Sequence, residues 1–172
     1  MTVVVFSDSH GRVTRIEEMM ERVTACSQKP VAVLFLGDGL SDLGGADALS
    51  GCPLIAVRGN CDMFRADDIP KERVITLGGY RILMLHGHTR GVKYGMAQAL
   101  AAAVRENADI LLFGHTHEPY AETFLEGRDY MGVKFSKRLH VMNPGSLAEG
   151  RFGSLALERG GVLMSYGDLY EK

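Results

Sequence analysis

The stretch TVVVFSDSH, residues 2–10, joins an apolar run to a turn that carries metal-binding side chains. Residues 2–6 are mostly β-branched or aromatic, as expected of a strand that is buried on both faces. Asp8 and His10 follow directly, and in an extended segment residues i and i+2 point to the same side. We therefore predict a buried strand whose end presents two donor groups to one pocket.

The same arrangement recurs four times further along the chain. Apolar runs at residues 31–36, 54–57, 80–85 and 110–113 each end in a metal-capable residue. Because ligands of α/β proteins gather outside the carboxyl ends of the strands, we expect the residues after these runs to converge in one crevice. Neighbouring glycines allow tight turns and the close approach of a ligand. The converging residues are Asp38, Asn60, His86, His115 and His117, and the glycines are Gly37, Gly59, Gly87 and Gly114.

The rest of the chain alternates between helical and strand-like patterns. Residues 13–23 and the alanine-rich residues 96–104 have apolar side chains at helical spacing. Residues 74–77 and 80–85 flank Gly78-Gly79, which is the signal of a β-hairpin. Later strand-like segments lie at residues 120–125, 139–142, 154–157 and 162–166. These patterns predict one α/β domain over residues 1–172, with two packed sheets and helices outside them.

Composition excludes several classes of partner. The 172 residues carry a formal net charge of -2 without clustered Lys and Arg, which argues against binding a long nucleic acid. The first strand begins too early in the chain for a signal peptide or a membrane span, so no membrane partner is expected. The three cysteines are odd in number and form no CxxC motif, which favours reduced thiols and a cytoplasmic protein.

The donor types narrow the chemistry of the crevice. Imidazole and carboxylate without thiolate suit Mn, Fe, Zn or Ni rather than a cysteine-rich structural zinc site. Seven donors are too many for one ion if a carboxylate bridges, but they suit two ions about 3.5–4 Å apart. Two divalent ions, two aspartates and a bridging hydroxide leave one net positive charge, which matches an anionic phosphate diester.

Each short motif also has a simpler interpretation. A single Asp-x-His or Gly-Asp at the end of a strand is usually a turn or a cap. A His-x-His pair more often packs or forms hydrogen bonds than binds metal. The occurrence of all of them in order, each after an apolar run, favours the metal centre.

The combined motifs resemble the five motifs of the calcineurin-like metallophosphoesterases. A sixth motif is similar to the extra signature of their short prokaryotic phosphodiesterase branch, which is itself similar to a metal-poor scaffold subunit of eukaryotic retromer. The resemblance runs from Thr2 to Ser146, nearly the whole chain. The motifs are Asp8-Ser9-His10, Gly37-Asp38, Gly59-Asn60-Cys61-Asp62, His86-Gly87-His88, Gly114-His115-Thr116-His117 and Asn143-Pro144-Gly145-Ser146.

This resemblance implies a four-layer α/β/β/α sandwich of two mixed β-sheets flanked by helices. It also implies a dinuclear phosphodiesterase for small or nucleotide-like esters, with manganese as the first choice of metal and Ni, Zn or Fe left open. A metal-bridging hydroxide would attack phosphorus. One ion would be held by Asp8, His10, Asp38 and His117, and the other by the bridging Asp38 with Asn60, His86 and His115.

Departures from the wider family refine these expectations. The residues after Asp38 lack the arginine of the GDxxDRG motif of protein Ser/Thr phosphatases, and Cys61 stands where many members have a histidine acid. His88 is either a catalytic residue in the phosphate pocket or a polar residue at its rim. Asp62 is expected to accept hydrogen bonds behind the ligands, and Asn143-Pro144-Gly145-Ser146 to form a bracing turn.

Two other functions remain as alternatives at this stage. One is a non-catalytic interaction scaffold on the same fold, although scaffold relatives have lost one or more of the histidines that are all present here. The other is a phosphomonoesterase, which would use the same metals with a different outer pocket. Homo-oligomerisation is also left open.

Overall fold

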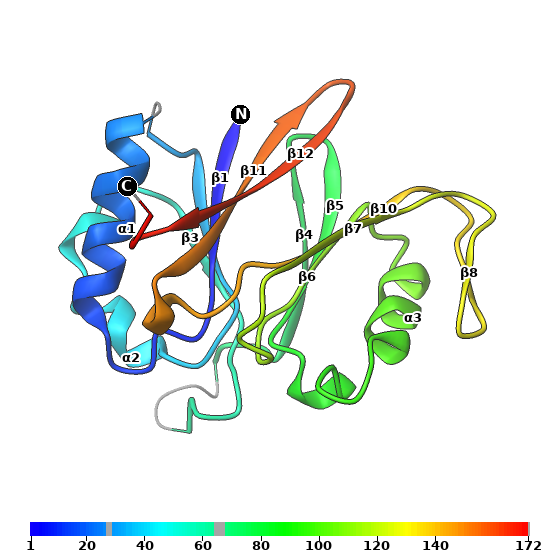
Figure 1. The fold of residues 1–172 in the computed structure, drawn as a ribbon, viewed down its shortest axis with the longest axis horizontal. Helices are drawn as coiled ribbons and strands as arrows, with labels where there is room; N and C mark the ends of the chain where they lie inside the picture. Colours follow the sequence, from blue (N-terminus) through cyan, green and yellow to red (C-terminus); the bar gives the residue numbers. More distant parts are fainter. Residues whose placement is uncertain (27–28, 64–67, 172) are drawn as a thin grey trace.

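The computed structural model describes residues 1–26, 29–63 and 68–171, and its framework is a pair of five-stranded β-sheets (Figure 1). The first sheet has the order β12-β11-β1-β2-β3, and the second has the order β4-β5-β6-β10-β7. The strands of the first sheet are β1 (Thr2–Phe6), β2 (Ala32–Phe35), β3 (Leu54–Ala56), β11 (Arg151–Glu158) and β12 (Gly161–Asp168). Those of the second are β4 (Glu72–Leu77), β5 (Tyr80–Leu85), β6 (Ile110–Leu112), β7 (Tyr120–Phe124) and β10 (Leu139–Asn143).

Helices cover the outer faces of both sheets. Helix α1 (Val13–Cys26) lies against the first sheet and α3 (Ala97–Arg105) against the second, at opposite sides of the molecule in Figure 1. The shorter elements are α2 (Leu40–Leu43), the 3-10 turns η1 (Asp47–Leu49), η2 (His88–Arg90) and η3 (Leu147–Glu149), and the hairpin of β8 (Asp129–Tyr130) with β9 (Val133–Lys134). Within the described ranges, no helix has the length and apolarity that crossing a membrane requires.

Alternating side chains separate the interior into three apolar layers. On β1, Val4 and Phe6 pack against Ile16 of α1, whereas Val3 and Val5 join the layer between the sheets. The second sheet repeats the pattern, since Ile82 and Met84 face the first sheet while Leu83 and Leu85 pack with Leu100 of α3. This alternation is the period of two that strand geometry imposes. Three apolar layers separate four structural layers, so the expected α/β/β/α sandwich is confirmed.

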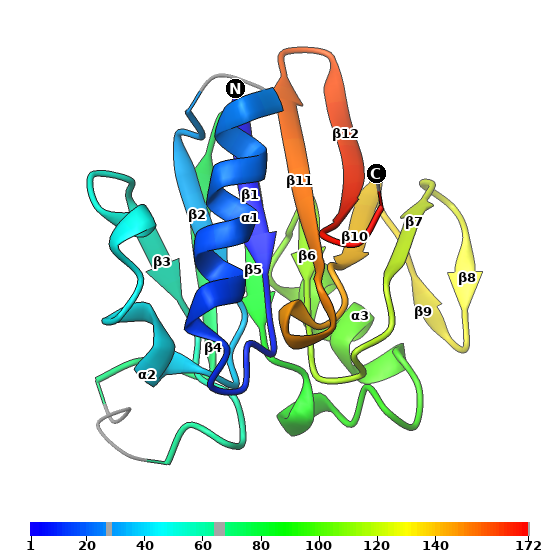
Figure 2. The same ribbon diagram turned by 60° about the vertical axis from the view of Figure 1, so that its left-hand side comes forward.

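Strand direction brings the candidate site together. In the first sheet β1, β2 and β3 run parallel, and in the second sheet β5, β6 and β10 do so. The carboxyl ends of each parallel set therefore meet at one edge of their sheet, and the loops that follow them gather at the bottom of Figure 2. Every motif named above lies at or directly after the end of one of these strands.

Most of the expected elements are present with adjusted bounds. The run at residues 31–36 forms a strand only over Ala32–Phe35, and that at residues 54–57 only over Leu54–Ala56. The last two strands are longer than their apolar runs because β11 and β12 pair with each other over eight residues, polar positions included. Helix α2 and the β8–β9 hairpin were not expected, since neither carries a periodic apolar pattern.

Candidate metal centre

The turns after the strands hold their ligand-type residues in an unusual backbone conformation. Seven non-glycine residues of the described chain have positive φ, and five of them are candidate ligands. Such left-handed positions cost free energy and concentrate at functional sites. The five are Asp8 (φ 56), His10 (φ 44), Asp38 (φ 60), His115 (φ 69) and His117 (φ 63).

This finding corrects one step of the sequence argument. Asp8 and His10 do meet, but not because they alternate along an extended segment, as their spacing suggested. Each lies in a left-handed turn, where the alternation rule does not apply. The same is true of His115 and His117, which point to different halves of the site.

The first half of the site consists of Asp8, His10 and His117. One donor atom from each lies within 4.8 Å of the other two. The Nε2 atoms of His10 and His117 are 3.2 Å apart, and they lie 3.6 Å and 3.1 Å from Oδ1 of Asp8. Asp8 is fully buried, whereas both histidines are partly open to solvent. An ion bound here would have a buried carboxylate on one side and solvent on the other.

The second half consists of Asp38, His86 and His115, again with donor atoms within 4.8 Å. The Nε2 atom of His86 lies 3.3 Å from Oδ2 of Asp38 and 4.0 Å from Oδ1 of Asp8. Asp38 also lies close to His10 in a further group with Cys61. Asp38 therefore lies near ligand-type residues of both halves, His86 at 3.3 Å and His10, and Asp8 also approaches the second half at the longer distance of 4.0 Å.

Two buried atoms of the candidate ligands lack the hydrogen bonds that buried polar atoms normally form. Oδ1 of Asp8 and Nε2 of His86 form no hydrogen bond within the described part of the chain. The Nδ1 atom of His86 donates a hydrogen bond of 2.8 Å to the carbonyl of Leu36, so in that tautomer Nε2 carries a free lone pair. Orphaned polar atoms of this kind are rare. Metal ions bound at the two halves would satisfy these atoms, so the residues present fit the two-metal centre that the motifs implied.

Electrostatics keep two of these donors, His115 and Asp38, in metal-binding form, whereas for His86 burial is outweighed by the contact with Asp38 and the charge of Asp8, which raise its pKa. Burial, assisted by the charges of His86 and Lys93, lowers the pKa of His115 to about 4, so its imidazole is neutral at pH 7. Burial alone would raise the pKa of Asp38, but the contact with His86 and the backbone N–H of Cys61 hold it below its usual range. A neutral imidazole and an ionised carboxylate are the species that ligate metals.

Similarity to known proteins agrees with this geometry. The calcineurin-like phosphoesterase superfamily domain matches residues 1–162. The chain belongs to this superfamily.

Two named relatives have comparable length. The probable metallophosphoesterase YsnB of Bacillus subtilis is 32% identical over 148 residues, covering 86% of this chain and 75% of that protein. The phosphodiesterase YfcE of Escherichia coli K12 is 27% identical, covering 98% of this chain and 87% of that protein.

Solved structures show the same fold. A predicted phosphoesterase from Streptococcus pneumoniae superposes with a TM-score of 0.74 at 27% identity, covering 98% of this chain and 89% of the other. Vps29 of Entamoeba histolytica complexed with Zn²⁺ superposes with a TM-score of 0.62 at 22% identity, covering 98% and 99%. The second likeness concerns the fold alone.

A partly buried hydrogen-bond network braces the candidate ligands of this phosphoesterase. The carboxylate of Asp62 accepts four backbone N–H bonds of 2.8 Å, from Asp38, Gly39, Leu40 and Gly59. It therefore clamps the Asp38 turn to the neighbouring loop, as expected of a hydrogen-bond acceptor behind the ligands. Gly59 is required there, because a Cβ atom at this position would lie 2.0 Å from Oδ1 of Asp38.

The Asn143-Pro144-Gly145-Ser146 turn braces the site, as expected. The Nδ2 atom of Asn143 donates to the carbonyl of Gly114 and to the hydroxyl of Thr116, which lies between His115 and His117. The Ser146 hydroxyl donates to the carbonyl of Asp8. One turn thus ties together the loops after β1 and β6.

Asp42 is a bracing residue that the sequence argument missed. It is buried, and its Oδ2 atom accepts bonds of 2.6 Å from the Ser9 hydroxyl and 2.9 Å from the backbone N–H of Gly11. These bonds hold the turn that carries Asp8 and His10. An acidic side chain four residues after Asp38 was the available signal, but its partners are more than 30 residues away in sequence.

Asn60, Cys61 and His88 lie at the open side of the centre. Asn60 is exposed and donates a 3.2 Å hydrogen bond to Sγ of Cys61. Burial, with the nearby Asp38, raises the pKa of Cys61 to about 11, so it stays a thiol. The ring of His88 lies 5.5 Å from that of His86, and with Arg58, Asn60 and Lys71 it lines a cavity of about 350 Å³.

Proposed function

We propose that this chain is a phosphodiesterase that uses two divalent transition-metal ions to hydrolyse small or nucleotide-like phosphate esters. Membership of the phosphoesterase superfamily supports the reaction class. The likeness to the phosphodiesterase YfcE favours diesters. The observation that carries the proposal is the pair of donor groups that meet at Asp38, with buried Asp8 and His86 atoms left without hydrogen bonds.

Each ion would have four protein ligands. Asp8, His10, Asp38 and His117 would hold one, and Asp38, Asn60, His86 and His115 would hold the other. Two divalent ions in such a site supply Lewis-acid stabilisation of phosphoryl oxygens and lower the pKa of a water molecule. Imidazole-rich ligation favours manganese, nickel, zinc or iron over magnesium.

The protein itself orients the candidate ligands and supplies positive charge at the open side of the site. The Asp62 clamp and the Asn143 turn hold the ligands in their strained turns before any substrate arrives. The positively charged residues at the open side, Arg58 and Lys71, line the same cavity as His88 and Asn60. They favour the approach of an anionic ester.

The position of His88 outside the donor groups supports a role on the substrate rather than on a metal. Its Nδ1 atom is buried and accepts no hydrogen bond from the described residues. Burial lowers the pKa of His88, and the charges of His86 and Lys71 act in the same direction. We propose that it contacts the phosphoryl group or the departing oxygen.

The proposal is tested by metal analysis of the purified protein, followed by assays on bis(4-nitrophenyl) phosphate and 4-nitrophenyl phosphate with Mn²⁺, Ni²⁺, Zn²⁺ and Mg²⁺. We expect about two transition-metal ions per chain and faster hydrolysis of the diester. Faster hydrolysis of the monoester would favour the phosphomonoesterase alternative. Failure to bind metal or to hydrolyse either ester would favour the scaffold alternative.

A further inference from the structure

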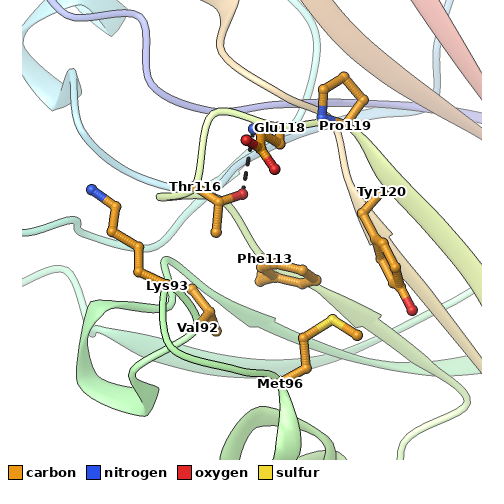
Figure 3. Close-up of a pocket in the computed structure, with 8 residues that line it drawn as sticks. All are labelled: Val92, Lys93, Met96, Phe113, Thr116, Glu118, Pro119 and Tyr120. Carbon is orange, nitrogen blue, oxygen red and sulfur yellow. Dashed lines mark hydrogen bonds between the residues drawn. The ribbon is translucent and has the colours of Figure 1, made fainter.

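A second cavity adjoins the metal centre on the side of the second sheet. It has a volume of about 420 Å³, within the usual range for small-molecule sites. Figure 3 shows Phe113 at its centre, with Met96 and Tyr120 on one side and Lys93 on the other. The catalytic proposal does not use any of these four residues.

The cavity lies beside two loops that carry candidate ligands. Thr116 lines it, and this residue separates the candidate ligands His115 and His117. Val92 also lines it, and its side chain packs against Gly87, the residue that follows the candidate ligand His86. A molecule held by the metals through a phosphoryl group could therefore extend directly into the cavity.

The walls of the cavity favour a flat apolar group. Phe113 and Tyr120 have ring centroids 6.3 Å apart, and Met96 offers a polarisable thioether beside them. Aromatic and thioether side chains pack well against another ring. The wall of the cavity at Thr116, between the candidate ligands His115 and His117, is held in position. The Thr116 hydroxyl accepts a 2.9 Å hydrogen bond from Nδ2 of Asn143.

The charged residues at the cavity set the orientation of an occupant. Lys93 lines the cavity on the side away from Tyr120 (Figure 3), and its positive charge favours the anionic phosphoryl end of a ligand there. Glu118 also lines the cavity and is exposed, and its carboxylate disfavours a second anionic group. The expected occupant thus has one phosphoryl group and a neutral ring.

We propose that this cavity binds the organic group of the substrate, and that the preferred substrates carry an aromatic or heteroaromatic ring on the ester. The inference rests on the proposed function, because the phosphoryl group is what places the ring at the cavity. The cavity would supply a selectivity for the organic group of the substrate that the metal ligands do not supply. Met96, Phe113 and Tyr120 form the apolar part of the cavity.

Phosphonates test the inference without turnover, since their carbon–phosphorus bond is not an ester. The dissociation constants of methylphosphonate, n-butylphosphonate and phenylphosphonate would be measured by calorimetry on the Mn²⁺-loaded protein. We expect phenylphosphonate to bind about tenfold more tightly than methylphosphonate, the effect of burying one ring. Equal binding of n-butylphosphonate and phenylphosphonate would overturn the assignment to a ring.

Substitutions at two methionines test whether the preference for phenylphosphonate arises in this cavity. Met96→Gln makes the cavity more polar and should reduce the preference for phenylphosphonate at least threefold, whereas Met96→Leu should keep it. Met131→Gln is the matched control, because Met131 is 78% exposed in the β8–β9 turn. An unchanged preference in Met96→Gln would overturn the proposal.

The outcomes separate this inference from the proposed function. If methylphosphonate binds and diesters are hydrolysed, but no phosphonate is preferred, only the assignment of the cavity fails. If no phosphonate binds and no ester is hydrolysed in the metal-loaded protein, both proposals fail together.

Discussion

The Nε2 atom of His86 lies 3.3 Å from Oδ2 of Asp38, although the two residues follow strands of different sheets. Both side chains are almost completely buried. The other ring nitrogen of His86, Nδ1, donates a hydrogen bond to the backbone carbonyl of Leu36, which also follows a strand of the first sheet. The metal centre therefore lies where the two sheets meet. Metal ions bound there would have ligands from both sheets, so metal binding would link the two sheets as well as the catalytic groups.

Metal removal should consequently affect stability as well as hydrolysis. Chelation should abolish the cleavage of bis(4-nitrophenyl) phosphate, and Mn²⁺ should restore it more fully than Mg²⁺. Metal at 100 times its dissociation constant stabilises a fold by about 2.7 kcal/mol. We expect Tm to rise by about 5–10 °C on reloading, measured by calorimetry. Full activity in protein shown to be metal-free would refute the mechanism.

Asp38 should be the most sensitive single ligand. Asp38→Asn removes a charge that both ions would share, but its amide oxygen can still accept the 2.7 Å bond from the backbone N–H of Cys61. We expect this variant to lose both ions and at least 100-fold in kcat/KM, whereas His86→Ala should mainly empty one site. Elemental analysis checks this, with Asp129→Asn as a surface control. Two ions per chain in Asp38→Asn would contradict the bridging role.

The meeting of these ligands was predictable from the sequence because of a simple rule of sheet geometry. Each apolar run is followed by one or two ligand-type residues, and parallel strands place those ends at a common edge. Resemblance to a known family added the layer order and the division of ligands between two ions. Strand direction places Asp38 and His86 each at the carboxyl edge of its own sheet, and the packing of the two sheets brings them together.

The local geometry was less accessible to sequence reasoning. The spacing of Asp8 and His10 suggested an extended segment, whereas both residues have positive φ. Asp and His tolerate that conformation better than most residues, but only the surrounding hydrogen bonds select it. Those bonds come from distant residues such as Asp42 and Ser146, so a local pattern could not reveal them.

Asp62 offers a test of that surrounding network. Asp62→Asn replaces one acceptor oxygen by an NH₂ group that faces backbone N–H donors, so at least one buried donor loses its partner. We expect a loss of about 2–4 kcal/mol in the free energy of unfolding of the metal-free protein, measured in urea. Metal affinity should fall about 10–100-fold.

Asp129→Asn is again the matched control for this change. Asp129 accepts a single backbone N–H, from Gly132, in an exposed turn. It should therefore lose less than about 1 kcal/mol. Equal losses in the two variants would show that the Asp62 clamp has no special role.

A salt bridge beside the His88 turn should make stability depend on pH. Glu72 accepts two 2.7 Å hydrogen bonds from Arg90, and this interaction lowers the pKa of Glu72. Because the folded-state pKa lies below the unfolded value of about 4.3, the pair stabilises the fold above that pH. The stabilisation is lost as the pH falls through the folded-state pKa.

Urea unfolding of the metal-free protein measures this effect. The difference between native protein and Glu72→Gln should be about 1 kcal/mol at pH 6 and should vanish near pH 3. In an Arg90→Met background the same substitution should give a small difference that does not change with pH. A difference that grows as the pH falls would contradict the assignment.

The last prediction concerns the proton of the departing alcohol. Cys61 stands where many related enzymes have a histidine acid, and its thiol is poorly matched to protonating an alkoxide at neutral pH. Cleavage of nitrophenyl diesters should therefore be fast, while esters of alcohols with high pKa should be slow. We would measure the chemical step across substituted aryl methyl phosphates and plot its logarithm against the leaving-group pKa.

The slope of that plot distinguishes the absence of a side-chain acid from proton donation by His88. If no side chain donates the proton, the native slope should be steep and should become shallower in Cys61→His, which restores an imidazole beside Asn60. His88 is the rival donor, because its ring lies 5.5 Å from that of His86 and its Nδ1 atom has no hydrogen bond within the described residues. A shallow native slope that steepens only in His88→Ala would make His88 the acid and would refute the missing-acid hypothesis.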